Sequence, residues 1–299
     1  MEVTLALGGG GVKGYAHLGV MRALQAKGIK ICSIAGTSIG GLMGALYAAG
    51  VDLDEARERL KVLDQSKLYT RRPGDGPSLI GMGGVIDVLK EPLGDLRFED
   101  LPIPLAMTAV DIKSGQPIVL NRGSLIEAIL ATTAIPGIFP SRTWGDREVV
   151  DGGILNPVPV AVARSLAPRL PVVAVVLSPA MSNWTEERPL PNLLAHIPLM
   201  SRVAKLRFAQ SIRLFLRSID ITGSMLADLR LQIEKPEVII RPIVHQIGLV
   251  DTVNIPELVD LGFQAAEAAL PQLKRWSGSR SPIDSRLPWG GPQGWSGKV

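Results

Sequence analysis

The chain has 299 residues, of which 46% are hydrophobic and 20% charged, and its formal net charge is +4. This composition excludes a disordered chain and allows a large, mostly aliphatic core. The single cysteine, Cys32, excludes an intramolecular disulfide framework and a cysteine-based zinc site. The sequence starts without a basic leader, and no apolar run approaches the roughly 20 residues that span a bilayer. We therefore expect a cytoplasmic protein, with peripheral contact to a membrane left open.

The first fifty residues alternate between strand-like and helix-like patterns. EVTLAL (2–7) predicts a strand, and GGGGVKG (8–14) is a loop that opens a helix ending near Gly28. ICSIAG (31–36) predicts a second strand, followed by a helix of small residues, IGGLMGALYAAG (39–50). This order indicates a parallel sheet with crossover helices.

The rest of the chain continues as one α/β domain with two insertions. We expect insertions at about 51–100 and 180–235, a domain over 1–274, and a loose tail over 275–299. Between the insertions the pattern predicts a strand over 103–112 that pairs with 117–121, a helix capped by Ser124 and Glu127, a hairpin over 142–150, a helix over 157–166 and a strand over 171–178. After the second insertion it predicts a strand over 237–244 and a closing helix over 256–273.

The glycine loop fits two chemistries. Gly9, Gly11 and Gly14 form the G-x-G-x-x-G pattern of dinucleotide-binding loops. That use requires an acidic residue at the end of the next strand, but residues 34–38 contain none, and no G-K-[S/T] follows for a P-loop. Successive glycine amides at the start of a helix also stabilise an oxyanion, which contributes about 3–4 kcal/mol per donor in acyl transfer.

The segment AGTSIGG (35–41) places one serine where a strand gives way to a helix. Gly36, Ser38 and Gly40 form a G-x-S-x-G pattern, in which the glycines let the strand and helix approach closely. Such an elbow presents a nucleophilic hydroxyl, and this position favours that interpretation over an inert surface turn.

A nucleophilic serine needs a base. The three histidines are His17 behind the glycine loop, His196 in the second insertion, and His245 at the end of the 237–244 strand. The order Ser38, Asp151, His245 would match a hydrolase triad. Asp151 ends an apolar run before two glycines, so its carboxylate can act alone if a dry pocket raises its pKa. The residues leave both arrangements open.

Three motifs stand in order in the chain: GGGGVKG (8–14), GTSIG (36–40) and DGG (151–153). Together with ATTAIPGIFP (131–140), they resemble the patatin-like phospholipase family over about 1–270. One departure is Thr132, which stands where that family more usually has serine. The resemblance implies a three-layer α/β/α fold with a mainly parallel central sheet.

The resemblance also implies a Ser–Asp dyad without a catalytic histidine, with Ser38 as nucleophile and Asp151 as base. The backbone amides of Gly9, Gly10 and Gly11 would form the oxyanion hole, and Lys13 would order the glycine loop. The motifs further include Gly14, Gly36, Gly40, Gly152 and Gly153. The implied activity is hydrolysis of acyl esters in phospholipids or lysophospholipids, with no metal and no cofactor.

Two other functions remain open from the sequence, a nucleotide-binding or regulatory module that uses the glycine loop, and an acyltransferase on a related scaffold. The missing acidic residue argues against the first, and Thr37 stands where such acyltransferases usually carry histidine beside the serine. We expect a lipid substrate and no nucleic-acid partner. Head group, acyl chain and oligomeric state are left open.

Part of the second insertion has the composition of a membrane-surface helix. Residues 198–219 carry five basic side chains and no acidic one, and apolar residues recur there at near-helical spacing (Val203, Leu206, Ile212 and Phe215). Such a segment either lies on an anionic lipid surface or packs on the domain with its charges in solvent. Trp276, Trp289 and Trp295 in the tail allow the same two interpretations.

Overall fold

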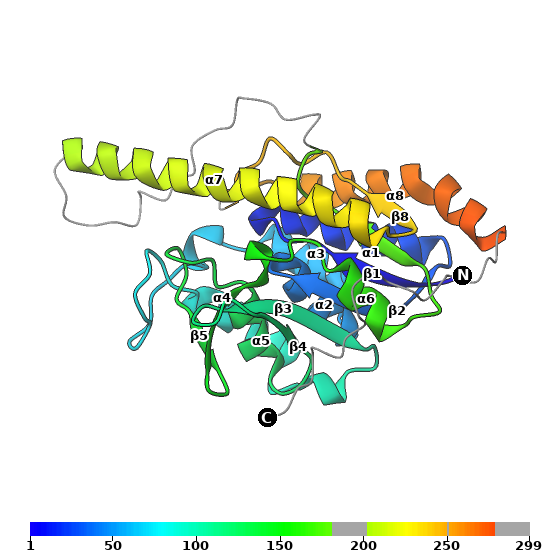
Figure 1. Cartoon of the computed structure of the whole chain (residues 1–299), viewed down its shortest axis with the longest axis horizontal. Coiled ribbons are helices and arrows are strands. Elements are labelled where there is room, and N and C mark those ends of the chain that lie inside the picture. Colours follow the sequence, from blue (N-terminus) through cyan, green and yellow to red (C-terminus); the bar gives the residue numbers. More distant parts are fainter. Residues whose placement is uncertain (181–201, 250, 279–299) are drawn as a thin grey trace.

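The computed structural model of the chain describes residues 1–180, 202–249 and 251–278 (Figure 1). In these residues eight strands form one sheet in the order β5-β6-β3-β2-β1-β7-β8, with β4 paired to β3. Five strands run parallel, namely β3 (Leu105–Asp111), β2 (Lys30–Thr37), β1 (Glu2–Leu7), β7 (Val172–Val175) and β8 (Val238–Ile240). The antiparallel pairings involve β4 (Pro117–Leu120), β5 (Arg142–Trp144) and β6 (Arg147–Asp151).

Helices cover both faces of this sheet. The larger core cluster joins the sheet to α1 (Tyr15–Ala26), α2 (Ile39–Ala48), α5 (Leu125–Thr132) and α8 (Ile255–Gly278). The first insertion adds α3 (Leu53–Lys61) and α4 (Gly83–Leu93) to the same cluster. Most of the buried aliphatic side chains therefore lie on this side, which agrees with the aromatic-poor composition.

The second face is covered by α6 (Val160–Leu166) and α7 (Arg202–Glu234). Four alanines on neighbouring strands lie in register beneath these helices, namely Ala106, Ala35, Ala6 and Ala174. Small side chains let helices approach the sheet closely, and Ala227 and Leu231 of α7 complete this cluster. The sheet is thus enclosed between two helical layers, which confirms the predicted α/β/α sandwich.

Several predicted boundaries were wrong by a few residues. The strand expected over 237–244 ends at Ile240, because Pro242 has no N–H to donate to the ladder. His245 therefore lies in the following loop instead of ending a strand. The helix expected from 157 begins at Val160, after Pro159, and α8 continues past residue 274 to Gly278. The rest of the expected tail, with Trp289 and Trp295, lies outside the described residues.

Two strands share one edge of β3. Thr108 of β3 pairs with Thr37 of β2, while its neighbour Ala109 pairs with Asp151 of β6. Since β4 occupies the other edge of β3 at both positions, β2 and β6 lie end to end. The strand β2 is parallel to β3 and β6 is antiparallel, so their carboxyl ends meet. This junction brings Ser38 and Asp151 together.

Candidate active site

Ser38 occupies a strained backbone conformation between β2 and α2. Its φ of 55° and ψ of −128° lie in a region that non-glycine residues rarely adopt. A Cβ on Gly36 would lie 2.4 Å from the Gly41 nitrogen, and one on Gly40 would lie 2.2 Å from the Leu7 carbonyl oxygen. Both flanking glycines are therefore required by close backbone packing, as the elbow pattern predicts.

Hydrogen bonds from three buried threonines, Thr37, Thr108 and Thr132, fix the Ser38 turn. The Thr132 hydroxyl accepts the Ser38 N–H at 2.9 Å and donates to the Thr108 carbonyl oxygen at 2.6 Å. Thr37 donates its hydroxyl to the Asn156 carbonyl oxygen at 2.8 Å. Because that proton is used, Thr108 donates to Thr37 across the 2.7 Å contact between their hydroxyl oxygens. This network satisfies the buried Ser38 amide and fixes the turn.

Asp151 faces Ser38 from the end of β6. Its carboxylate accepts a hydrogen bond from the Gly153 N–H at 2.7 Å. Burial raises the pKa of Asp151 to about 6, and the nearby Ser38 side chain and the Gly153 N–H offset part of that rise. Both Ser38 and Asp151 are less than a tenth exposed. The carboxylate is thus ionised at neutral pH, dry, and beside the Ser38 side chain.

The glycine loop packs directly on the elbow. A Cβ on Gly9 would lie 3.4 Å from the Ser38 Cβ, and one on Gly14 would lie 2.0 Å from the Ile39 side chain. Gly9 donates its amide to the Pro157 carbonyl oxygen at 2.9 Å. The amides of Gly10 and Gly11 make no hydrogen bond to any residue that the structure describes. Gly10 and Gly11 are therefore the candidate oxyanion donors, while Gly9 shapes the loop.

Lys13 belongs to a short 3-10 helix, η1 (Gly11–Gly14), that joins the glycine loop to α1. The Lys13 side chain is only 1% exposed, and its ammonium lies 3.5 Å from the carboxylate of Asp220 on α7. It accordingly serves as a structural part of the loop and is not presented to solvent.

The histidines are placed as follows. His17 is fully buried and donates its Nε2–H to the Gly8 carbonyl oxygen at 2.8 Å, and burial lowers its pKa to about 4. It is therefore neutral and packed behind the loop, as expected. His245 makes no hydrogen bond to Ser38 or Asp151 among the described residues. His196 lies outside the residues that the structure describes.

Some residues at this site were not given roles by sequence reasoning. Thr132 was visible as a departure from the family pattern, but its bond to the Ser38 amide depends on how α5 packs. Thr37, Thr108 and Asn156 are too common in type to stand out. Asp220 lies far along the chain in an insertion, and no sequence signal connects it to Lys13.

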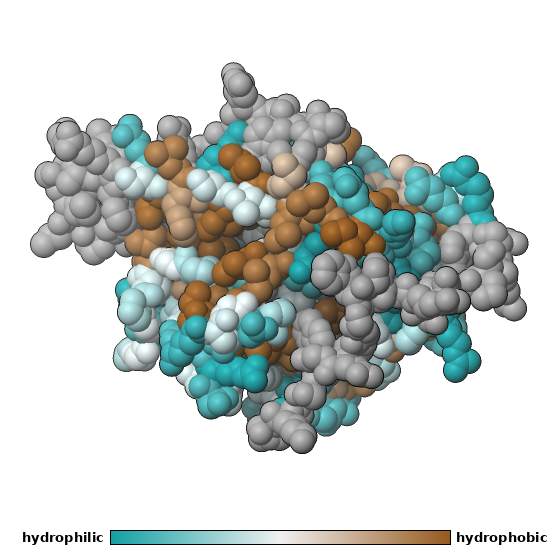
Figure 2. All heavy atoms as spheres, viewed as in Figure 1, coloured by the Kyte–Doolittle hydropathy of each residue, from teal (hydrophilic) through white to brown (hydrophobic). Residues whose placement is uncertain are grey.

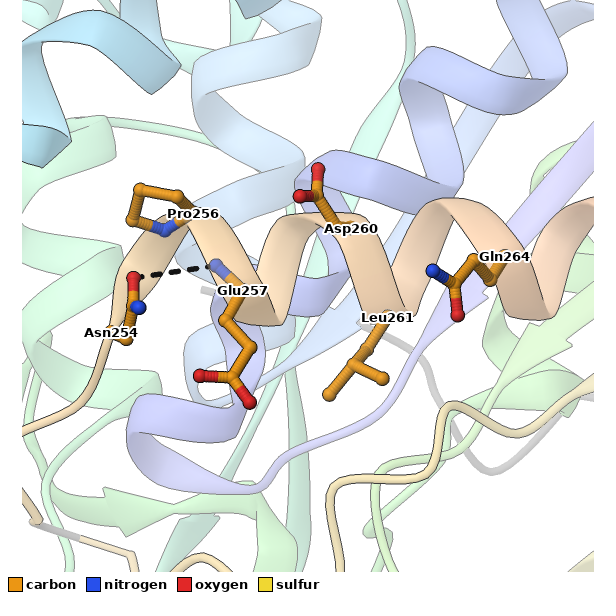
Figure 3. Close-up of a pocket in the computed structure, with 6 residues that line it drawn as sticks. All are labelled: Asn254, Pro256, Glu257, Asp260, Leu261 and Gln264. Carbon is orange, nitrogen blue, oxygen red and sulfur yellow. Dashed lines mark hydrogen bonds between the residues drawn. The ribbon is translucent and has the colours of Figure 1, made fainter.

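A separate hollow lies at the start of α8, with a volume of about 430 Å³ (Figure 3). Asn254, Glu257, Asp260 and Gln264 line it, and Asn254 caps the helix by accepting the Glu257 N–H at 3.5 Å. Asp260 is paired with Arg57. Neither Ser38 nor Asp151 contributes to this hollow, so it is distinct from the candidate active site.

The described residues were also compared with the patterns of membrane-spanning helices and metal sites. Among them, no helix is both long and apolar enough to cross a membrane. No set of three or more histidine, cysteine, aspartate or glutamate side chains is gathered there in a way that suits a metal ion.

Comparison with known proteins identifies the family of this chain. The family model described as patatin-like phospholipase matches residues 5–164, which include the glycine loop, the elbow and Asp151. The chain belongs to the patatin-like phospholipase family.

Individual relatives agree with this assignment. An uncharacterized NTE family protein of Mycobacterium tuberculosis is 39% identical over 54% of this chain, and a second one is 30% identical over 90% of it. Patatin-like phospholipase domain-containing protein 7 of Mus musculus is 31% identical over 58% of the chain. The chain spans about half the length of the mycobacterial relatives, 45% and 46%, and 13% of the mouse protein.

A solved structure resembles the fold. VipD from Legionella pneumophila aligns with 91% of this chain and 67% of its own, with a TM-score of 0.53 and 13% sequence identity. At this identity the likeness concerns the fold alone.

Proposed function

We propose that the protein is a serine hydrolase of lipid acyl esters, with phospholipids or lysophospholipids as substrates. The observation that carries this proposal is the placement of Ser38 beside the buried Asp151 carboxylate, with the glycine loop packed on Ser38. Family membership supports the lipid substrate class. The chemistry of Ser38 and Asp151 supports the reaction type.

The proposed reaction has two halves. Ser38 Oγ attacks the ester carbonyl carbon while its proton passes to Asp151, and the amides of Gly10 and Gly11 stabilise the negative oxygen that forms. The tetrahedral intermediate then collapses, and the leaving alcohol takes the proton from Asp151. In the second half Asp151 removes a proton from water, which attacks the acyl-enzyme. The acyl–Oγ bond then breaks, Asp151 returns the proton to Ser38 Oγ, and the fatty acid leaves.

The competing functions have less support. Gly9 packs on Ser38, and a Cβ on Gly11 would lie 1.9 Å from the Leu249 carbonyl oxygen, so the loop is packed on the elbow and on the 241–249 segment. This packing favours a role for the glycine loop in catalysis at Ser38 over a role as a separate phosphate-binding loop. An acyltransferase would also need a second acceptor and a histidine near the serine, and Thr37 is fully committed to Thr108 and Asn156.

The function is tested by measuring fatty acid release by mass spectrometry. The purified protein is incubated with phosphatidylglycerol, lysophosphatidylcholine and triacylglycerol, each beside a Ser38→Ala control. Release from a phospholipid or lysophospholipid that is lost in the control supports the proposal. Equal release by both proteins, or none from any of the three lipids by folded wild type, contradicts it.

We also propose that α7 contacts an anionic membrane surface. Of the stripe predicted from sequence, Val203 and Leu206 lie outside the residues whose side chains are described, Ile212 packs on the core and Phe215 is 43% exposed. A different stripe, which we call the apolar stripe of α7, faces solvent with 41–65% exposure (Leu214, Ile221, Met225, Leu229 and Ile233). Their spacing of seven and then four residues places them on one helix face. Figure 2 shows hydrophobic residues gathered along the course of this helix.

A contiguous exposed apolar surface marks an interaction site. The segment 198–219, which overlaps the start of this stripe, has five basic residues and no acidic one, which complements an anionic surface. Flotation with phosphatidylglycerol vesicles tests the contact, with Met225→Asp/Leu229→Asp as the variant and phosphatidylcholine vesicles as the control. Flotation that depends on the anionic lipid and is lost in the variant supports it. Flotation unchanged by the variant, or absent, contradicts it, and a dimer in solution would assign the stripe to self-association instead.

A further inference from the structure

The ion pair between Lys13 and Asp220 joins the glycine loop to α7. Lys13 is 1% exposed and Asp220 is 12% exposed, with 3.5 Å between Nζ and Oδ1. A buried ammonium is costly unless an opposite charge lies beside it, so the Asp220 carboxylate stabilises Lys13 in its buried position. The α7 helix is otherwise anchored to the sheet by Ala227 and Leu231. Asp220 therefore lies on a helix whose place is fixed independently of Lys13.

The Lys13 side chain also contacts the backbone that carries the proposed oxyanion donors. Its Cε would lie 3.4 Å from a Cβ placed on Gly10, and the Leu177 Cβ would lie 2.9 Å from the same point. Lys13 and Leu177 thus both pack on the side of Gly10 where a Cβ would point. Further along the loop, Val12 donates its amide to the Leu249 carbonyl oxygen at 3.0 Å. A shift of Lys13 would therefore move Gly10 and Gly11.

We propose that Asp220 is a positioning residue for the oxyanion hole: its carboxylate holds Lys13, and Lys13 sets the direction of the Gly10 and Gly11 amides. The inference rests on the proposed function and adds a residue outside the matched family region, 5–164, to the same site. It makes α7, the helix that bears the apolar stripe, a direct support of the catalytic loop.

Oxyanion donors act in the transition state more than in substrate binding, so their misplacement lowers kcat more than it raises KM. For Asp220→Asn on a soluble p-nitrophenyl ester, we expect kcat to fall about 10- to 100-fold with KM within about twofold. Asp220→Glu keeps the charge and should recover most of the lost rate. A purely structural role for Asp220 would change the amount of folded protein and leave kcat per folded molecule unchanged.

Asp228 supplies a matched control on the same helix. It pairs with Arg241 at 2.9 Å, two turns further along α7. Asp228→Asn removes another ion pair of α7, one that is more exposed than the Lys13–Asp220 pair, and should leave kcat unchanged. Lys13→Met and the double variant Lys13→Met/Asp220→Asn complete a cycle. If the two residues act as one unit, the double variant loses no more than the larger single loss.

Hydrogen exchange of the full-length chain gives a second readout that needs no activity. Asp220→Asn should speed amide exchange in residues 8–14, and Asp228→Asn should not. Unchanged exchange in Asp220→Asn overturns the inference whatever the activity. With active wild type, an unchanged kcat in Asp220→Asn overturns it while the proposed function survives. Inactive, folded wild type would overturn the proposed function, and exchange would still decide whether Asp220 holds the loop.

Discussion

The Ser38 side chain lies beside Asp151 because their two strands end against each other on one edge of β3. Thr37 is paired with Thr108, and Asp151 with the next residue, Ala109. The relative placement of Ser38 and Asp151 is therefore set by the register of three strands. Side-chain choice alone would not fix it. The threonine network and Gly152, whose Cβ position would lie 2.2 Å from Thr108 Oγ1, lock the same junction.

The raised pKa of Asp151 predicts how activity depends on pH. The carboxylate must be ionised to accept the Ser38 proton, and its pKa is about 6. We expect kcat/KM for a non-ionising ester to be level above pH 7 and to fall about tenfold per pH unit well below 6. Measurement from pH 4.5 to 9 checks this. A profile that stays level down to pH 5 would rule out Asp151 as the base.

Asp151 also predicts an unusual stability change. Its pKa is raised on folding, so its favourable contribution is present below about pH 4 and is lost as pH rises through 6. Asp151→Asn removes the buried charge and should increase the free energy of unfolding at pH 8 by about 1–3 kcal/mol, with the gain vanishing near pH 4. Urea unfolding at both values measures it.

Asp111 is the matched control for that experiment. A hydrogen bond from Ser114 lowers its pKa, so its contribution has the opposite sign and is lost as pH falls through the lowered value. Asp111→Asn should lower stability at pH 8. If Asp151→Asn lowered the free energy of unfolding at pH 8 as Asp111→Asn does, burial of the Asp151 charge would not destabilise the fold, which would contradict the prediction.

Thr132 should prove important through its hydroxyl. Thr132→Val keeps the shape but leaves the buried Ser38 amide without its acceptor, which costs about 1–3 kcal/mol of stability and lowers kcat. Thr132→Ser should preserve both. The neighbouring Thr133→Val is the control, since that hydroxyl donates to the Ile129 carbonyl oxygen at 2.6 Å and lies 3.6 Å from the Met82 sulfur, away from the Ser38 amide. Equal effects of the two valine variants would argue against a special role for Thr132.

Gly40 should tolerate no side chain. The added methyl of Gly40→Ala would lie 2.2 Å from the Leu7 carbonyl oxygen, so β1 or α2 must move. We expect a loss of about 3 kcal/mol or more, or failure to fold, measured by thermal and urea unfolding. Gly76→Ala, which has no atom within 4 Å of the new methyl, should change stability by about 0.5 kcal/mol at most. A stable Gly40→Ala protein would contradict the close strand–helix approach.

Local sequence patterns predicted much of this fold. The apolar runs of β1, β2, β3 and β7, the serine elbow and the β3–β4 hairpin follow from periodicity and turn residues, which act between near neighbours. The same reasoning picked out Ser38 and Asp151 as separate candidates. It left the choice between Asp151 and His245 open until the motifs were compared with a family.

Other features depend on contacts between distant segments. The α7 helix covers the second face of the sheet over a row of alanines. Its charge-rich sequence nevertheless predicted an insertion outside the sandwich. The end-to-end placement of β2 and β6, the bond from Gly9 to Pro157, and the pair between Lys13 and Asp220 likewise arise from tertiary packing. No spacing in the sequence encodes them.

The most direct test of the dyad is labelling with a fluorophosphonate probe, which reacts with activated serines. Folded wild type is compared with Ser38→Ala, Asp151→Asn and His245→Ala under identical conditions. We predict labelling in wild type and His245→Ala, and its loss in Ser38→Ala and Asp151→Asn. Loss of labelling in His245→Ala, or full labelling in Asp151→Asn, would contradict a Ser38–Asp151 dyad.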